Sequence, residues 1–232
     1  MKNLNHKNLF IFLVTLSLIN VVVYIICRNK TYFDFLNWNL FLAWIPLVLS
    51  SLVYLIYKRS KVKSIFLVLL GMLWLLFFPN SPYVITDLIH LTVKKDLYAT
   101  NGIIGFAYWI DFVVIHLFTW TSLLLGAFST YQIQYVLMSL FNKTISWCFV
   151  MITSIAGGYG ILLGREYRLN SWEAITDWSK VTGIIEGSLT SSSVFFCLLF
   201  GLFIGTVYVT IYVLINCMSA SKEGKKDLKK VR

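Results

Sequence analysis

The sequence contains little charge and very little proline. Charged residues make up 13% of its 232 residues, against about 25% in an ordinary soluble domain, and 58% of the chain is hydrophobic. An ordinary soluble fold and a disordered chain are therefore both excluded. Three prolines and 13 glycines also exclude a collagen-like repeat. The remaining fold class is all-α, a polytopic helical membrane protein.

Cysteine is scarce as well, and the spacing of the four cysteines indicates no functional site. Cys27, Cys148, Cys197 and Cys217 lie in or beside apolar segments, with no C-x-x-C pair and no neighbouring histidine. This spacing supports no disulfide scaffold, metal site or redox site, and it names no cofactor. We expect the four thiols to be small packing residues.

The charge that is present is mostly basic. The formal net charge is +10, from 20 Lys and Arg against 10 Asp and Glu. These basic residues gather at the ends of apolar runs and in residues 222–232, which is typical of topology determinants and of contact with anionic lipids. We therefore expect membrane lipids as partners and no nucleic acid. Residues 1–221 form one transmembrane domain, and residues 222–232 form a basic tail.

About 20 apolar residues cross a bilayer, and six segments qualify. The predicted spans are Leu9–Cys27, Leu40–Tyr57, Ser64–Phe78, Ile103–Ala127, Ile145–Gly164 and Leu189–Asn216. The N-terminus, the second and fourth loops and the tail carry 13 Lys and Arg, against 7 in the other loops. Basic residues favour the cytoplasmic side, so both termini are predicted to be cytoplasmic. The loops after the third and fifth spans then share the outer face.

The first of these outer loops predicts a short helix at the membrane interface. Ser81 followed by Pro82 is typical of a helix start, with the hydroxyl as the cap. One polar stripe follows, formed by Tyr83, Thr86, Asp87 and His90. The i, i+3 spacing of Asp87 and His90 suits an acid/base pair, in which the carboxylate orients the imidazole. The alternative is an amphipathic helix whose polar groups only face water.

The fourth span contains two ionisable residues. Asp111 lies about two turns below the predicted outer end and His116 lies near mid-membrane. A carboxylate at that depth is costly unless it is paired, so Asp111 is a functional candidate that a donor such as Arg165 would compensate. His116 is either a neutral histidine hydrogen-bonded inside the bundle or, with Asp111, the relay of a proton-coupled transporter.

The loop after the fifth span contains Arg165 and Arg168. Two guanidinium groups at i, i+3 suit one phosphate or carboxylate, although snorkelling to lipid headgroups beside a helix C-terminus is the alternative. Asn170 and Glu173 have the spacing of a helix cap, which predicts a second interfacial helix carrying Trp172 and other apolar side chains. We thus expect two short outer interfacial helices.

Small residues form stripes on the last two spans. Gly160 and Gly164 lie on the fifth span, and Gly201 and Gly205 on the sixth, at the spacing that lets helices approach closely. These stripes are expected to be packing faces, within the chain or against a partner helix.

Three blocks of the sequence together resemble a known family. They are Phe78-Pro79-Asn80-Ser81-Pro82-Tyr83 with Thr86-Asp87-Leu88-Ile89-His90-Leu91, then Trp109-Ile110-Asp111, and then Gly164-Arg165 with Arg168-Leu169-Asn170-Ser171-Trp172. The chain resembles the bacterial membrane-protein family called domain of unknown function 1361. The resemblance implies a multi-pass protein of the bacterial plasma membrane and brings no activity, substrate or cofactor.

Three functions fit these patterns. The leading hypothesis is an outward-facing enzyme that acts on a lipid or lipid-linked phosphate. In it, Asp87, His90 and Asp111 are the catalytic groups and Arg165 and Arg168 bind the anion, so all five must line one cavity. The alternatives are a transporter or proton-coupled permease that uses Asp111 and His116, and a non-catalytic membrane assembly subunit.

Overall fold

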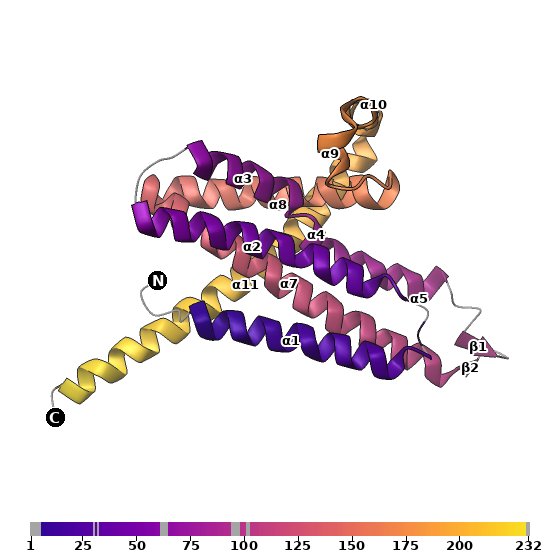
Figure 1. The fold of residues 1–232 in the computed structure, drawn as a ribbon, viewed down its shortest axis with the longest axis horizontal. Helices are drawn as coiled ribbons and strands as arrows, with labels where there is room; N and C mark the ends of the chain where they lie inside the picture. The colour runs from indigo at the N-terminus through magenta and orange to yellow at the C-terminus, as the bar shows by residue number, and fades with distance from the viewer. Residues whose placement is uncertain are drawn as a thin grey trace.

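A computed structural model describes residues 6–29, 31, 33–60, 65–93, 98–100 and 103–230 of the protein (Figure 1). Within these residues, six helical segments are long and apolar enough to cross a membrane, which confirms the predicted polytopic helical fold. Five are single helices: α1 (His6–Cys27), α2 (Leu36–Ser60), α7 (Phe106–Leu140), α8 (Lys143–Glu166) and α11 (Ser191–Lys230). α1 begins and α11 ends at the same end of the bundle (Figure 1), as an even number of spans requires.

The remaining span is broken into four pieces. They are α3 (Ile65–Phe77), α4 (Asn80–Tyr83), the 3₁₀ helix η1 (Val84–Leu88) and α5 (Ile89–Val93). The break falls at Pro79, which has no N–H to continue the helical ladder. The helix restarts at Asn80 rather than at a capping Ser81. The Ser81 hydroxyl instead donates a 3.0 Å hydrogen bond to the carbonyl of Ala43 in α2, which corrects the predicted cap.

The fourth span is longer than the sequence predicts. α7 continues past Ala127 to Leu140, and the connection to α8 is reduced to Phe141 and Asn142. Its 35 residues span about 52 Å at 1.5 Å per residue, more than a hydrocarbon core requires. The polar residues that suggest a loop are buried in contacts with other helices. Gln132, for example, accepts hydrogen bonds from Ser50 at 2.7 Å and from Ser51 at 3.1 Å.

α7 is also the central helix of the bundle. It packs against α1, α2, α4, η1, α8 and α11. The largest apolar cluster surrounds its first half, where Val114, Ile115 and Phe118 are all at most 1% exposed. Because α7 touches almost every other span, it fixes the positions of the helices that carry the polar residues of the site.

The glycines on α8 and α11 are packing residues of this chain. A Cβ on Gly160 would lie 2.3 Å from Pro79 Cγ, and one on Gly201 would lie 2.9 Å from the Ile155 Cα. Gly164 lies beside the Tyr83 ring, and Gly205 beside Ser154. The expected small-residue contacts are therefore made inside the chain, and they bring α8 directly against the broken third span.

Two smaller units complete the fold. One is a hairpin of β1 (Ala99–Thr100) and β2 (Ile103–Ile104), in which Ala99 pairs with Ile104 and Thr100 with Ile103. The other is the pair α9 (Glu173–Thr176) and α10 (Trp178–Ser188), which connects α8 to α11. In Figure 1 this pair projects from the bundle beside the C-terminal end of α8.

Candidate functional site

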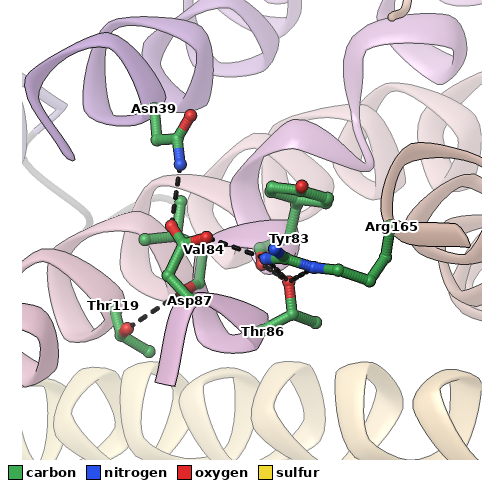
Figure 2. A network of polar contacts seen from close by, with 7 residues as sticks. All are labelled: Asn39, Tyr83, Val84, Thr86, Asp87, Thr119 and Arg165. Carbon is green, nitrogen blue, oxygen red and sulfur yellow. Dashed lines mark hydrogen bonds and ion pairs between the residues drawn. The ribbon is translucent and has the colours of Figure 1, made fainter. Parts of the chain in front are cut away.

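A buried ion pair joins the broken third span to α8. Arg165 Nη2 lies 2.8 Å from Asp87 Oδ1, and the Asp87 side chain is 1% exposed. The second carboxylate oxygen accepts a 2.7 Å hydrogen bond from Asn39 Nδ2 of α2. Figure 2 shows the Asp87 carboxylate held between Asn39 and Arg165. The sequence identifies Asp87 and Arg165 as site residues, and the structure brings these two together.

Further contacts fix the Arg165 guanidinium in this position. Its Nε donates a 3.0 Å hydrogen bond to the Thr86 hydroxyl, and Nη2 donates to the same oxygen. The guanidinium carbon lies 4.5 Å from the centre of the Tyr83 ring, which is a cation–π contact. Tyr83, Thr86 and Asp87 are three of the four residues of the predicted polar stripe, and these three contact Arg165 of α8.

The 3₁₀ turn explains how neighbouring residues reach one guanidinium. The Thr86 hydroxyl donates a 2.6 Å hydrogen bond back to the Tyr83 carbonyl. The Thr119 hydroxyl of α7 donates a 3.3 Å hydrogen bond to the Val84 carbonyl. These bonds hold the tight turn against α7 and direct Thr86 and Asp87 towards Arg165 (Figure 2). The backbone geometry of the site therefore depends on α7.

Beside the ion pair lies a cavity of about 390 Å³. Its walls come from α2, α3, α4 and α8, and its cover comes from the loop after α8 together with α9 and α10. Leu42, Leu76 and Leu163 belong to its apolar part, and Asn39, Asn80 and Ser171 to its polar part. Asn39 and Tyr83 belong to both the cavity wall and the network around the ion pair, so they separate the pair from the cavity.

The five predicted site residues do not line this cavity together, since none of them is among its lining residues. Asp87 and Arg165 lie behind the wall. The His90 ring packs against Phe35 and Phe33, with ring centres 4.9 Å and 5.8 Å apart. The expectation of one cavity lined by all five groups is therefore wrong for this site, because the charged groups are used in packing and in pairing.

Asp111 has a different partner from the one expected. It is 0% exposed, and its Oδ2 accepts a 2.6 Å hydrogen bond from the Tyr98 hydroxyl. Its Oδ1 has no hydrogen-bond partner among the described residues. Arg165 is directed at Asp87 instead, so the predicted compensation of Asp111 by Arg165 is wrong. The Tyr98 bond joins the start of the β1–β2 hairpin to α7.

His116 lies on the exposed surface of α7 and not inside the bundle. One ring nitrogen, Nδ1, lies 2.7 Å from the Phe112 carbonyl oxygen of its own helix. Asp111 is fully buried, whereas His116 faces outward beside Trp120, which is 62% exposed. The structure therefore does not bring the two groups of the proposed relay to a common face.

Arg168 differs from Arg165 in both exposure and backbone. It is an exposed residue with a φ of 52°, the one positive φ among the described residues other than glycine. The Leu169 N–H donates a 3.1 Å hydrogen bond to the Leu163 carbonyl, six residues back, which closes the C-terminal end of α8. Arg168 directly follows the C-cap Tyr167 in a left-handed conformation, a position where glycine is the usual residue. The two arginines therefore have different environments.

The cover over the cavity is held by contacts between Asn170 and Glu173, although α9 has Trp172 as its N-cap and lacks the side-chain cap that the sequence predicts. The Glu173 carboxylate accepts a 2.6 Å hydrogen bond from the Asn170 backbone N–H and a 2.9 Å hydrogen bond from the Asn170 side-chain amide. It also pairs with Lys180, and this bond lowers the pKa of Glu173 to about 2. Trp178 lines the cavity and is still 67% exposed, so its ring spans the cavity and the outer surface.

Sequence reasoning missed the amide and hydroxyl groups that build the site. Asn80 donates 3.0 Å to the Ser171 hydroxyl, which ties the broken span to the loop after α8. Asn39 and Asn37 lie directly before the predicted span Leu40–Tyr57, and amides at the end of a span are the signal that would have found Asn39. For a metal ion, the described residues contain no suitable group of three or more His, Cys, Asp or Glu.

These features define a multi-pass helical membrane protein with a polar network and a cavity near one end of its bundle. Residues 38–207 match the family described as Protein of unknown function (DUF1361), and the chain belongs to that family. The matched range contains both members of the ion pair and all residues that line the cavity. Neither the curated proteins nor the solved structures contain a match to the chain.

Proposed function

We propose that the protein faces outward from the bacterial plasma membrane and binds a lipid or lipid-linked phosphate, with part of the lipid in the cavity. The observation that carries this proposal is the cavity itself. It combines apolar walls with a polar end at Asn39, Asn80 and Ser171, and it lies beside a buried ion pair. Such a combination suits an amphipathic ligand, because apolar surface binds a chain and a few placed polar groups orient a head.

The position of the cavity supports binding from the outer leaflet. The distribution of basic residues favours cytoplasmic termini, and the cavity lies at the C-terminal end of α8, away from the termini. Its cover exposes Ile175 and Trp178, by 66% and 67% respectively. Tryptophans are enriched at membrane interfaces, so α9 and α10 suit a position among the headgroups, with the cavity beneath them.

A catalytic role would require the ion pair to open. Both Asp87 oxygens already accept hydrogen bonds, one from Arg165 and one from Asn39. A phosphate that draws Arg165 away would free Asp87 Oδ1 to accept a proton from a substrate or a water. In this enzyme version of the proposal, Arg165 binds the anion and Asp87 is the base, whereas His90 and Asp111 lie in other contacts.

The experiment that tests lipid binding fills the cavity from one side. Ala156 lines it from α8, and Ile152, one turn earlier, is 65% exposed on the outer surface of the bundle. We expect Ala156→Phe to lose the lipids that co-purify with the wild type and Ile152→Phe to retain them, as measured by mass spectrometry. Ala174→Phe, which fills the cavity from α9, serves if Ala156→Phe does not accumulate. Equal lipid retention by all of these variants would refute the proposal.

A further inference from the structure

The polar end of the cavity is uncharged. Among the described residues that line it there is no Asp, Glu, Lys, Arg or His, although a buried ion pair lies directly behind the wall. The ion pair is internally neutral, and Asn39 and Tyr83 separate it from the cavity. A ligand group that enters this end therefore meets amides, hydroxyls and aromatic rings, and it meets no counter-charge.

Three asparagine side chains of the cavity each have a partner that can only accept a hydrogen bond, and this fixes the orientation of their amides. Asn39 Nδ2 donates a 2.7 Å hydrogen bond to the Asp87 carboxylate, and Asn80 Nδ2 donates a 3.0 Å hydrogen bond to the Phe77 carbonyl. Asn170 Nδ2 donates 2.9 Å to the Glu173 carboxylate. Carboxylates and carbonyls have no proton to give, so in each case the amide nitrogen must face the partner.

The amide oxygens are consequently open to a ligand, together with the second side-chain N–H of Asn39 and of Asn170, each of which uses only one N–H in the described hydrogen bonds. Asn39, Asn80 and Asn170 all line the cavity, and the described hydrogen bonds use their side-chain nitrogens and not their side-chain oxygens. Ser171 adds a further donor. Its oxygen already accepts from Asn80, so its hydroxyl proton remains to be donated. The cavity thus offers three acceptors and at least three donors.

This pattern separates three kinds of polar head. The oxygens of an ionised phosphate only accept, so they cannot satisfy three amide oxygens. An ammonium group only donates, and its charge would have no carboxylate in the cavity to compensate it. A hydroxyl group donates to an amide oxygen and accepts from the Ser171 hydroxyl, and it carries no charge.

We infer that the cavity recognises a neutral, hydroxyl-bearing lipid head, a glycerol or a sugar, and leaves the phosphate outside the cavity. This inference rests on the proposed lipid binding and assigns the class of head. Trp38, Tyr83 and Trp178 support it, because their rings supply flat apolar surface beside the three amides, and this arrangement suits the C–H faces of a polyol or sugar. The exposed Arg168 guanidinium lies in the same loop as Asn170 and Ser171, at a position that suits the excluded phosphate.

The test measures lipid binding to the full-length chain, purified in lauryldimethylamine oxide, a detergent without hydroxyl groups. Phosphatidylglycerol, phosphatidic acid and phosphatidylethanolamine with the same acyl chains are titrated and followed by native mass spectrometry. We expect phosphatidylglycerol to bind at least about tenfold more tightly than the other two, because acceptors that a ligand covers and leaves without a donor are costly. Glucosyl diacylglycerol forms a fourth arm, which distinguishes a sugar head from a glycerol head.

Two variants connect the preference to the cavity. Asn80→Leu removes an acceptor and Ser171→Ala removes a donor, and both should reduce the preference for phosphatidylglycerol to below about threefold. Asn216→Leu and Ser139→Ala are the matched controls, since both residues bond to carbonyls of their own helices away from the cavity. Both controls should keep the full preference. Thermal stability of each variant is measured alongside, and Ser171→Ala carries the test if Asn80→Leu does not fold.

The outcomes separate this inference from the proposed function. Phosphatidic acid binding as tightly as phosphatidylglycerol would overturn the hydroxyl assignment and leave lipid binding intact. Phosphatidylethanolamine binding most tightly would overturn it in favour of an amine head. A set of affinities that Ala156→Phe does not change would instead refute lipid binding in the cavity, and the inference with it.

Discussion

The Asp87–Arg165 pair should contribute most of the stability that holds the third span against α8. Asp87→Asn keeps the shape of the side chain and removes its charge. The new amide can accept from Arg165, but its nitrogen would then face Asn39 Nδ2, and two donors would oppose each other across the present 2.7 Å bond. Arg165 would also lose its charge partner while 19% exposed, so water could compensate it only in part.

Breaking a buried pair from one side costs about 3 kcal/mol. At this chain length such a loss lowers the melting temperature by roughly 6–12 °C. We expect that shift for Asp87→Asn, measured by thermal scanning of the purified protein in detergent. Asp34→Asn is the matched control, because Asp34 accepts a 2.6 Å hydrogen bond from Tyr24 but lies on the exposed surface, where the loss should be below about 1 kcal/mol.

The double variant decides whether the pair is the cause. Arg165→Gln in the Asp87→Asn background removes the uncompensated guanidinium, so the two losses should be less than additive by about 1 to 3 kcal/mol. Additive losses would mean that the residues act independently. A melting temperature for Asp87→Asn equal to that of Asp34→Asn would refute the reasoning altogether.

Three further predictions concern the other polar residues. Arg168→Gly should leave the melting temperature unchanged or slightly higher, because relief of a left-handed backbone worth about 1–2 kcal/mol is offset by greater freedom in the unfolded chain; a large loss in a thermal scan would contradict this. Tyr98→Phe should destabilise the protein by about 1–3 kcal/mol, because it leaves both Asp111 oxygens without a donor among the described residues. Asp111→Asn should cost less, because its new amide can still accept the hydrogen bond from Tyr98. A larger loss for Asp111→Asn in the same scan would contradict this reasoning. With the native cysteines replaced, Glu186→Cys should react with impermeant maleimide in intact cells and Asn142→Cys should not, and the opposite labelling would invert the topology.

The six spans could be predicted because span formation depends on local composition. An apolar run of about 20 residues has few alternatives in a bilayer, whatever it packs against. The boundaries of α7 could not be predicted in the same way. Gln132 and Gln134 suggest a loop by composition, and only the hydroxyls of Ser50, Ser51 and Tyr208 make these amides compatible with a buried helix.

Two charged residues of the site stand out in the sequence, but their pairing could not be predicted. Asp87 and Arg165 stand out in the sequence as ionisable groups near span ends, but the bond between them joins positions 78 residues apart. No local pattern specifies such a partner. The choice of Asp87 over Asp111 depends on the break at Pro79 and on Gly160, which lets α8 approach that proline. The small residues, read correctly as packing sites, therefore also determine which acid meets the arginine.

The cavity and the ion pair are coupled through the two residues that they share. The Asn39 side-chain nitrogen donates a hydrogen bond to Asp87, and the Tyr83 ring makes a cation–π contact with the Arg165 guanidinium. Both side chains also line the cavity. A ligand that bonds to the Asn39 oxygen polarises the same amide that stabilises the Asp87 carboxylate, so each bond strengthens the other. Coupling of this kind is reciprocal. If the intact ion pair raises the affinity for the ligand by some factor, bound ligand shifts the equilibrium towards the intact pair by the same factor. A lipid in the cavity would therefore hold the ion pair closed, and the open state that catalysis by Asp87 requires would arise only where the ligand also presents an anion to Arg165.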